Sequence, residues 1–123
     1  MLTILLGPRK WVIKLMKDDP AEVNHILGSI YNVLKEYPMD QIQITVVAYS
    51  SGMRVLKKDY INTVATERIQ SLMEYNVEFI ACINTMETME WNEKDFIDGL
   101  EYVQAGIVEL LERQVDGYIL ITP

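Results

Sequence analysis

Residues 42–49 read Ile-Gln-Ile-Thr-Val-Val-Ala-Tyr, the clearest strand pattern in the sequence. The segment is rich in β-branched residues and almost entirely apolar from Ile44 onwards. Such a run is typical of a strand that is buried on both faces, as in a parallel sheet with helices on either side. We therefore expect residues 42–49 to form a central strand.

The segment before this strand predicts another strand and a helix. Lys10–Met16 predicts a first strand. Asp19 is a favourable N-cap, Pro20 suits the first helical position, and Glu22 stands where a capping-box partner is expected. The helix ends before Pro38. Its apolar residues recur at spacings of three and four and predict one buried face: Val23, Ile26, Leu27, Ile30, Leu34 and Tyr37.

The alternation of strand and helix patterns continues after residue 49. The expected elements are a helical turn at Met53–Lys58, a helix at Thr63–Tyr75, strands at Val77–Cys82 and Glu101–Gln104, a helix at Ala105–Asp116 and a strand at Tyr118–Thr122. Gly117 stands at the C′ position of the last helix. The apolar residues of that helix are expected to point inward: Ile107, Val108, Leu111 and Val115.

This order of elements predicts an α/β fold, with a mainly parallel sheet, helices on both faces and right-handed crossovers. A length of 123 residues predicts one domain, residues 1–123. Residues 1–8 do not fit the plan and are expected to be either an extra edge strand or a tail.

The composition is that of an ordinary soluble protein, with 50% hydrophobic and 24% charged residues. The net charge of −7 disfavours nucleic acid and anionic membranes as partners, because phosphate binding needs a basic surface. No apolar run approaches the roughly 18 residues that cross a bilayer. The run Leu2–Leu6 is too short for a signal-peptide core. With a single cysteine, we expect a cytoplasmic location.

Several catalytic signatures are absent from the sequence. It has no Gly-rich phosphate loop after the first strand, no CxxC pair and no G-x-S-x-G motif. The only histidine, His25, is expected to be a solvated helix residue. A zinc site needs more His and Cys residues, and the carboxylates between residues 84 and 101 lack EF-hand spacing. We therefore expect neither a metal nor a cofactor.

Cys82, the only cysteine, stands at the end of the predicted third strand. Sites in open α/β sheets form in the crevice beyond the carboxyl ends of the strands. The Asn84-Thr85 pair offers natural N-caps, so a helical turn and these side chains could donate hydrogen bonds to a thiolate and lower its pKa. Glu87 and Glu90 act in the opposite direction, and the sequence leaves the direction of the shift open. A buried structural thiol is the alternative.

The segment 84–101 mixes acidic residues with apolar ones, and several readings of it stay open. It could form a lid, a surface that docks a partner or ligand, an oligomer interface, or ordinary core. The apolar residues concerned are Met86, Met89, Trp91, Phe96, Ile97 and Leu100.

Four segments together resemble the DsrE/DsrF-like family of intracellular sulfur-relay proteins. They are residues 44–56 (ITVVAYSSGMRVL), 77–86 (VEFIACINTM), 103–110 (VQAGIVEL) and 114–123 (QVDGYILITP). The resemblance implies a three-layer α/β/α sandwich around a five-stranded, mainly parallel sheet of flavodoxin-related appearance. It also implies a homo-oligomer, with a trimer favoured over a dimer or hexamer.

The resemblance further implies that Cys82 carries sulfur as a persulfide. Gly106, Glu109, Gly117 and Tyr118 match family positions that look structural. The sequence departs from the family in one place. Many relatives have His-Gly after the second strand, where this chain has Tyr49-Ser50, and neither of these side chains is a good base near neutral pH.

Two functional hypotheses follow. In the first, the protein is a sulfur carrier or sulfurtransferase: Cys82 accepts sulfane sulfur from a donor protein or molecule and passes it to a partner protein. Asn84 and Thr85 would stabilise the anionic sulfur, and Tyr49 and Ser50 would line the pocket. In the second, the protein is a non-catalytic oligomeric module with a structural Cys82, and the acidic, Met-rich segment 84–101 docks a partner or ligand.

Overall fold

The computed structural model describes residues 7–123 of the chain. Its centre is a five-stranded sheet in which all pairs are parallel and the strand order is β4-β3-β2-β1-β5. The strands are β1 (Arg9–Leu15), β2 (Ile42–Ala48), β3 (Glu78–Cys82), β4 (Glu101–Val103) and β5 (Ile119–Leu120). Residues 42–48 form the middle strand, as predicted.

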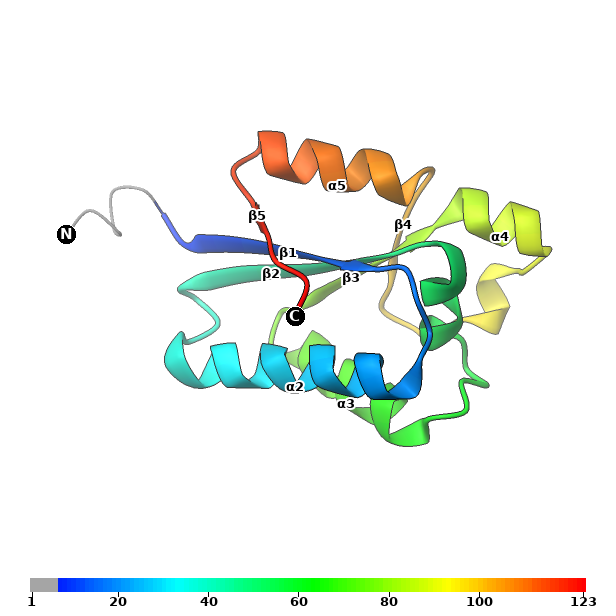
Figure 1. The fold of residues 1–123 in the computed structure, drawn as a ribbon, viewed down its shortest axis with the longest axis horizontal. Helices are drawn as coiled ribbons and strands as arrows, with labels where there is room; N and C mark the ends of the chain where they lie inside the picture. The colour runs from blue at the N-terminus through cyan, green and yellow to red at the C-terminus, as the bar shows by residue number, and fades with distance from the viewer. Residues whose placement is uncertain (1–6) are drawn as a thin grey trace.

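The longer helices lie in two layers, one on each face of the sheet (Figure 1). The α-helices are α2 (Pro20–Glu36), α3 (Thr63–Glu74), α4 (Ile83–Met89) and α5 (Gly106–Val115), and the 3₁₀ helices are η1 (Ser50–Leu56) and η2 (Glu93–Asp95). Helices α2 and α3 cover one face, and α5 covers the other. The predicted α/β/α sandwich is confirmed.

Local sequence explains where these elements begin and end. The Asp19 side chain accepts a hydrogen bond from the Glu22 N–H at the start of α2, with Pro20 as its first residue. Gly117 has φ +92° directly after α5, a conformation that favours glycine. Where bounds were predicted, the observed strand and α-helix boundaries lie within two residues of them, whereas the turn expected at Met53–Lys58 begins earlier, at Ser50. No bounds were predicted for α4.

The core lies mainly between the sheet and the α2/α3 layer. Alternate residues of the central strands point into it, among them Ile13, Val46 and Phe79. The α5 side holds a smaller cluster made of Val12, Val47, Ile80 and Leu110. The sheet is therefore packed unequally, with one helix on its α5 face.

The prediction for the buried face of α5 was wrong. Residues expected to point inward are exposed instead: Ile107, Val108, Leu111 and Val115, of which Leu111 is 59% and Val115 83% exposed. Gly106 and Leu110 face the sheet, because the Tyr49 ring leaves room only for a glycine at the first turn and Leu110 fills the space beside Val12 and Val47. The apolar spacing was helical, but it marks the outer face.

The expectation of an edge strand or tail at residues 1–8 lies almost wholly outside the described residues, and Gly7 and Pro8 are not in a strand. Within residues 7–123, no helix has the length and hydrophobicity needed to span a bilayer.

Candidate functional site

Cys82 is the last residue of β3 and also the N-cap of α4, so the strand passes directly into the helix. The sequence analysis expected Asn84 and Thr85 at the N-cap, but they lie in the first turn of α4. The helix starts earlier because no loop separates it from the strand. The Cys82 residue is only 4% exposed, yet it lines a cleft of about 390 Å³ at the carboxyl end of the sheet.

The sulfur of Cys82 contacts the segment that joins β4 to α5. The backbone N–H of Gly106, the first residue of α5, lies 3.4 Å from Sγ and donates a hydrogen bond to it. In the thiol form, S–H can donate to the carbonyl oxygen of Gln104, 3.7 Å away. Sequence reasoning treated Gly106 as a structural residue and did not connect it with the thiol.

The pKa of the Cys82 thiol is lowered from its ordinary value. Burial raises the pKa, but hydrogen bonds from the Thr85 hydroxyl and from the backbone N–H groups of Gly106, Thr85 and Asn84 outweigh it. These donors stabilise the anion more than the neutral thiol. The direction that the sequence left open is thus downward, and neither Glu87 nor Glu90 is among the causes.

Ser50 orients the Thr85 hydroxyl. The backbone N–H of Ser50 donates to Oγ1 of Thr85 at 3.0 Å, so this oxygen is already an acceptor and its own hydrogen is free to point at Cys82. Ser50 has φ +53°, a left-handed conformation that is uncommon outside glycine. Ser50 follows β2 at the start of η1, and its N–H contacts Thr85 of α4 from there.

Asn84 and Gln104 tie the starts of α4 and α5 together. The Asn84 N–H donates to the Gln104 carbonyl at 2.9 Å, and the Gln104 side-chain amide donates to Oδ1 of Asn84. The Asn84 side chain is therefore engaged with Gln104, and its backbone N–H is the Asn84 group that lowers the Cys82 pKa.

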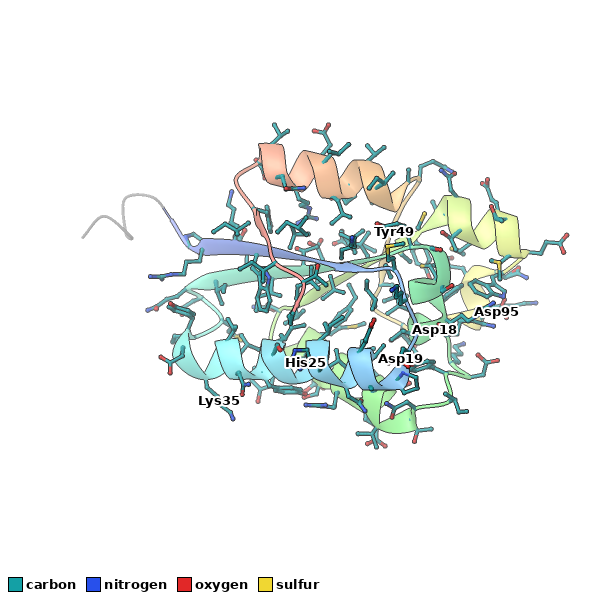
Figure 2. The ribbon with its side chains drawn as sticks, in the orientation of Figure 1. Asp18, Asp19, His25, Lys35, Tyr49 and Asp95 are labelled. Carbon is teal, nitrogen blue, oxygen red and sulfur yellow. The ribbon has the colours of Figure 1, made fainter. Side chains whose placement is uncertain are left out.

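Tyr49 forms a wall of the cleft beneath the first turn of α5 (Figure 2). Its hydroxyl contacts Sδ of Met16 at 3.8 Å, and burial raises its pKa, so it is a poor base near neutral pH. The structure thus brings the five predicted site residues to one cleft: Cys82, Asn84, Thr85, Tyr49 and Ser50.

Sequence reasoning missed Arg54, which lines the same cleft from η1. A sequence signal did exist, since Arg54 follows the predicted second strand by only a few residues, at the edge where sites are expected. Of the described residues that line the cleft, Arg54 is the only charged one.

The segment after the thiol packs into the core. Met86, Phe96 and Ile97 are buried, and Trp91 contacts Phe96 edge to face with ring centroids 5.9 Å apart. Met89 lines the cleft and is partly exposed. Most of these apolar side chains therefore belong to the core, which was one of the alternatives left open for segment 84–101.

The remaining candidates lie apart from the cleft. His25 is exposed on α2 (Figure 2). Across residues 7–123, no group of three or more His, Cys, Asp or Glu side chains is arranged to hold a metal ion. Arg113 joins α5 to the sheet through an ion pair with Glu78 of β3 at 2.8 Å. It also donates a hydrogen bond to the Tyr118 hydroxyl and pairs at 2.7 Å with Glu109 within α5, which supports a structural role for Glu109 and Tyr118.

The fold and the cleft define an α/β protein with a hydrogen-bonded cysteine at the carboxyl end of a parallel strand. The model of the DsrE/DsrF-like family matches residues 16–123, so the chain belongs to this family. The family as a whole is associated with sulfur relay. The structure is similar to that of MTH1491, a protein of unknown function from Methanobacterium thermoautotrophicum. The TM-score is 0.85 and the identity 27%, over 94% of this chain and 99% of that one. Comparison with curated protein sequences finds no match.

Proposed function

We propose that the protein carries sulfane sulfur as a persulfide on Cys82 and passes it to a partner protein. The observation that carries this proposal is the Cys82 sulfur itself, which lines a cleft and has a pKa lowered by four hydrogen-bond donors. A lowered pKa raises the fraction of thiolate near neutral pH, and the thiolate is the reactive form.

The transfer consists of two displacements at sulfur. In the first, the Cys82 thiolate attacks the outer sulfur of a donor, a new S–S bond forms, and the donor leaves with the electron pair of its broken bond to that sulfur. In the second, an acceptor thiolate attacks the outer sulfur of the persulfide, and the Cys82 thiolate leaves. Neither step needs a metal, a cofactor or a general base once the thiolate is present.

The residues around the sulfur have distinct parts in this proposal. Thr85 and Gly106 stabilise the Cys82 thiolate, which attacks in the first displacement and leaves in the second. Ser50 positions the Thr85 hydroxyl, and Asn84 and Gln104 hold the two helix starts in place. Tyr49 lines the cleft and packs against Gly106 in the first turn of α5.

Loading tests the proposal directly. The protein is incubated with inorganic polysulfide and its intact mass is measured under non-reducing conditions. Wild type is expected to gain the mass of one sulfur atom or more, whereas Cys82→Ser gains none. Equal gain by Cys82→Ser, or no gain by wild type, contradicts a carrier role.

The low exposure of Cys82 favours a second candidate, a non-catalytic module in which this thiol is structural. The rate of alkylation by iodoacetamide separates the two. A carrier with a lowered thiol pKa reacts faster than an unperturbed cysteine at neutral pH, and a structural thiol reacts more slowly.

The outer face of α5 supports assembly with further copies of the chain. Ile107, Val108, Leu111 and Val115 share this face and are all more than half exposed. Such an apolar surface is typical of a subunit interface. We propose a homo-oligomer through α5, with a trimer favoured over a dimer or hexamer. A reducing compartment such as the cytoplasm suits its single thiol.

A further inference from the structure

The Cys82 cleft carries one formal charge, and that charge is positive. The described residues that line it are polar or apolar and uncharged, apart from Arg54. No carboxylate among the described residues lines it. A partly enclosed cavity with a single cation favours an anionic ligand, because its apolar walls weaken the screening by water.

Arg54 has donors to spare for such a ligand. Its one ion-pair partner within residues 7–123, Asp18, is 3.9 Å away, and both side chains are about half exposed, so the pair is weak. Asp18 does not line the cleft. The Arg54 guanidinium also lies over the Trp91 ring, with Cζ 5.8 Å from the ring centroid. Its planar fork is suited to bidentate contact with an oxyanion.

The cleft also admits a donor of defined size. A volume of about 390 Å³ accommodates a small molecule beside the thiol. Ala105, the N-cap of α5, also lines the cleft and makes no side-chain cap hydrogen bond. Arg54 and Cys82 line the same cleft, so an anion held there by Arg54 would share the cavity with the thiol.

We propose that Arg54 selects a small sulfane-sulfur donor with an anionic oxygen head, of the thiosulfate or thiosulfonate class. This inference rests on the proposed carrier function and names its donor. For thiosulfate, the Cys82 thiolate attacks the outer sulfur and forms a new S–S bond. The S–S bond of thiosulfate breaks, and sulfite leaves with the electron pair. Atoms and charge balance, with no other oxidant or reductant.

Two methanethiosulfonate reagents that differ in the charge of their tail, one a sulfonate and one a trimethylammonium, test the selection without sulfur transfer. Each rate with Cys82 is divided by the rate of the same reagent with a small free thiol. Wild type is expected to favour the anionic reagent, and Arg54→Gln to lower the anion-to-cation ratio roughly tenfold, the size expected for one charge in a partly exposed cleft. Arg54→Lys keeps the charge and is expected to keep most of the ratio.

Lys57→Gln is the matched control. The Lys57 Nζ also lies over the Trp91 ring, 4.6 Å from its centroid, but Lys57 does not line the cleft. It is expected to leave the ratio unchanged. A ratio that is equal in wild type and Arg54→Gln, or that falls as far in Lys57→Gln, overturns the assignment to Arg54.

Loading from thiosulfate is the second readout, and Arg54→Gln is expected to slow it by a similar factor. Wild type that loads from inorganic polysulfide but not from thiosulfate contradicts the donor assigned here and leaves the carrier function standing. Wild type that loads from neither contradicts the carrier function itself.

Discussion

The backbone N–H of Gly106 lies 3.4 Å from Sγ of Cys82, so the first residue of α5 donates to the thiol at the end of β3. The contact joins two residues that are 24 positions apart in the sequence. It depends on the close approach of α5 to Tyr49, since a Cβ atom at residue 106 would lie 2.9 Å from the Tyr49 Cβ. One glycine therefore serves both the packing of α5 and the chemistry of Cys82.

Gly106→Ala is expected to destabilise the protein by roughly 1–3 kcal/mol, the usual cost of overpacking. Alkylation of Cys82 should also slow, because α5 must move its N–H away from the sulfur. Urea unfolding and iodoacetamide kinetics measure the two effects. Gly28→Ala is the control: a methyl group there would lie 3.7 Å from its nearest neighbour, Nη2 of Arg68, and alanine in a helix gains up to about 1 kcal/mol. Equal stability of the two variants would contradict the steric argument.

Thr85→Val removes the hydroxyl that stabilises the Cys82 thiolate and keeps the side-chain shape. The pKa of Cys82 should rise, so the alkylation profile moves to higher pH and the rate at pH 7 falls about tenfold. Thr85→Ser should restore most of the rate. Thr88→Val is the control, because the Thr88 hydroxyl donates to the Asn84 carbonyl and is not among the groups that shift the pKa. A profile unchanged in Thr85→Val would exclude the hydroxyl as a donor.

Glu101→Gln should stabilise the protein at neutral pH. The pKa of Glu101 is raised, first by its hydrogen bond with Glu78 and then by the charge and burial around it. A raised carboxyl pKa means that the ionised form is disfavoured in the folded state, so the penalty is full above the folded pKa and vanishes below the unfolded value. The gain in the free energy of unfolding should therefore shrink as the pH falls through the raised folded pKa, and it should vanish below the unfolded value of about 4.3.

Urea unfolding at several pH values measures this gain, with Glu112→Gln as the control for the change in net charge. Glu112 is exposed on α5. Arg113 lowers and Glu109 raises the Glu101 pKa as well, so both residues stay unchanged in the experiment. A gain that grows on acidification would contradict the linkage.

Leu111→Glu places a charge in the middle of the outer face of α5. If this face joins copies of the chain, the variant should dissociate to a particle of 14.2 kDa, and light scattering after size exclusion measures its mass. Ile61→Glu is the control, because Ile61 is 85% exposed and lies outside α5. An assembly that survives Leu111→Glu, or a wild type that is already monomeric, would rule out this interface.

The architecture could be predicted because it depends on local patterns. The β-branched run at 42–48, the Asp19 N-cap and the Gly117 stop each determine their own element, and the parallel sheet follows from their alternation. The place of Cys82 at a strand end followed from the same patterns.

The features that the sequence predicted wrongly, left open or missed depend on contacts between distant segments. The apolar spacing of α5 marks a face but not its direction, which Tyr49 decides by excluding a side chain at residue 106. The Thr85 hydroxyl is close to Cys82 in the sequence, but another donor that lowers the Cys82 pKa, the Gly106 N–H, comes from the β4–α5 connection, which no local pattern brings to the sulfur. Arg54 reaches the cleft only because η1 turns back beside the start of α4.

A load-and-chase experiment tests the carrier role most directly. Wild type is treated with a sulfane-sulfur donor, freed of excess donor, weighed intact, then mixed with an acceptor thiol and weighed again. The account predicts that wild type gains the mass of sulfur and loses it to the acceptor, which becomes a persulfide, while Cys82→Ser does neither. Sulfur that binds without Cys82, or that stays on the protein in the presence of the acceptor, would contradict it.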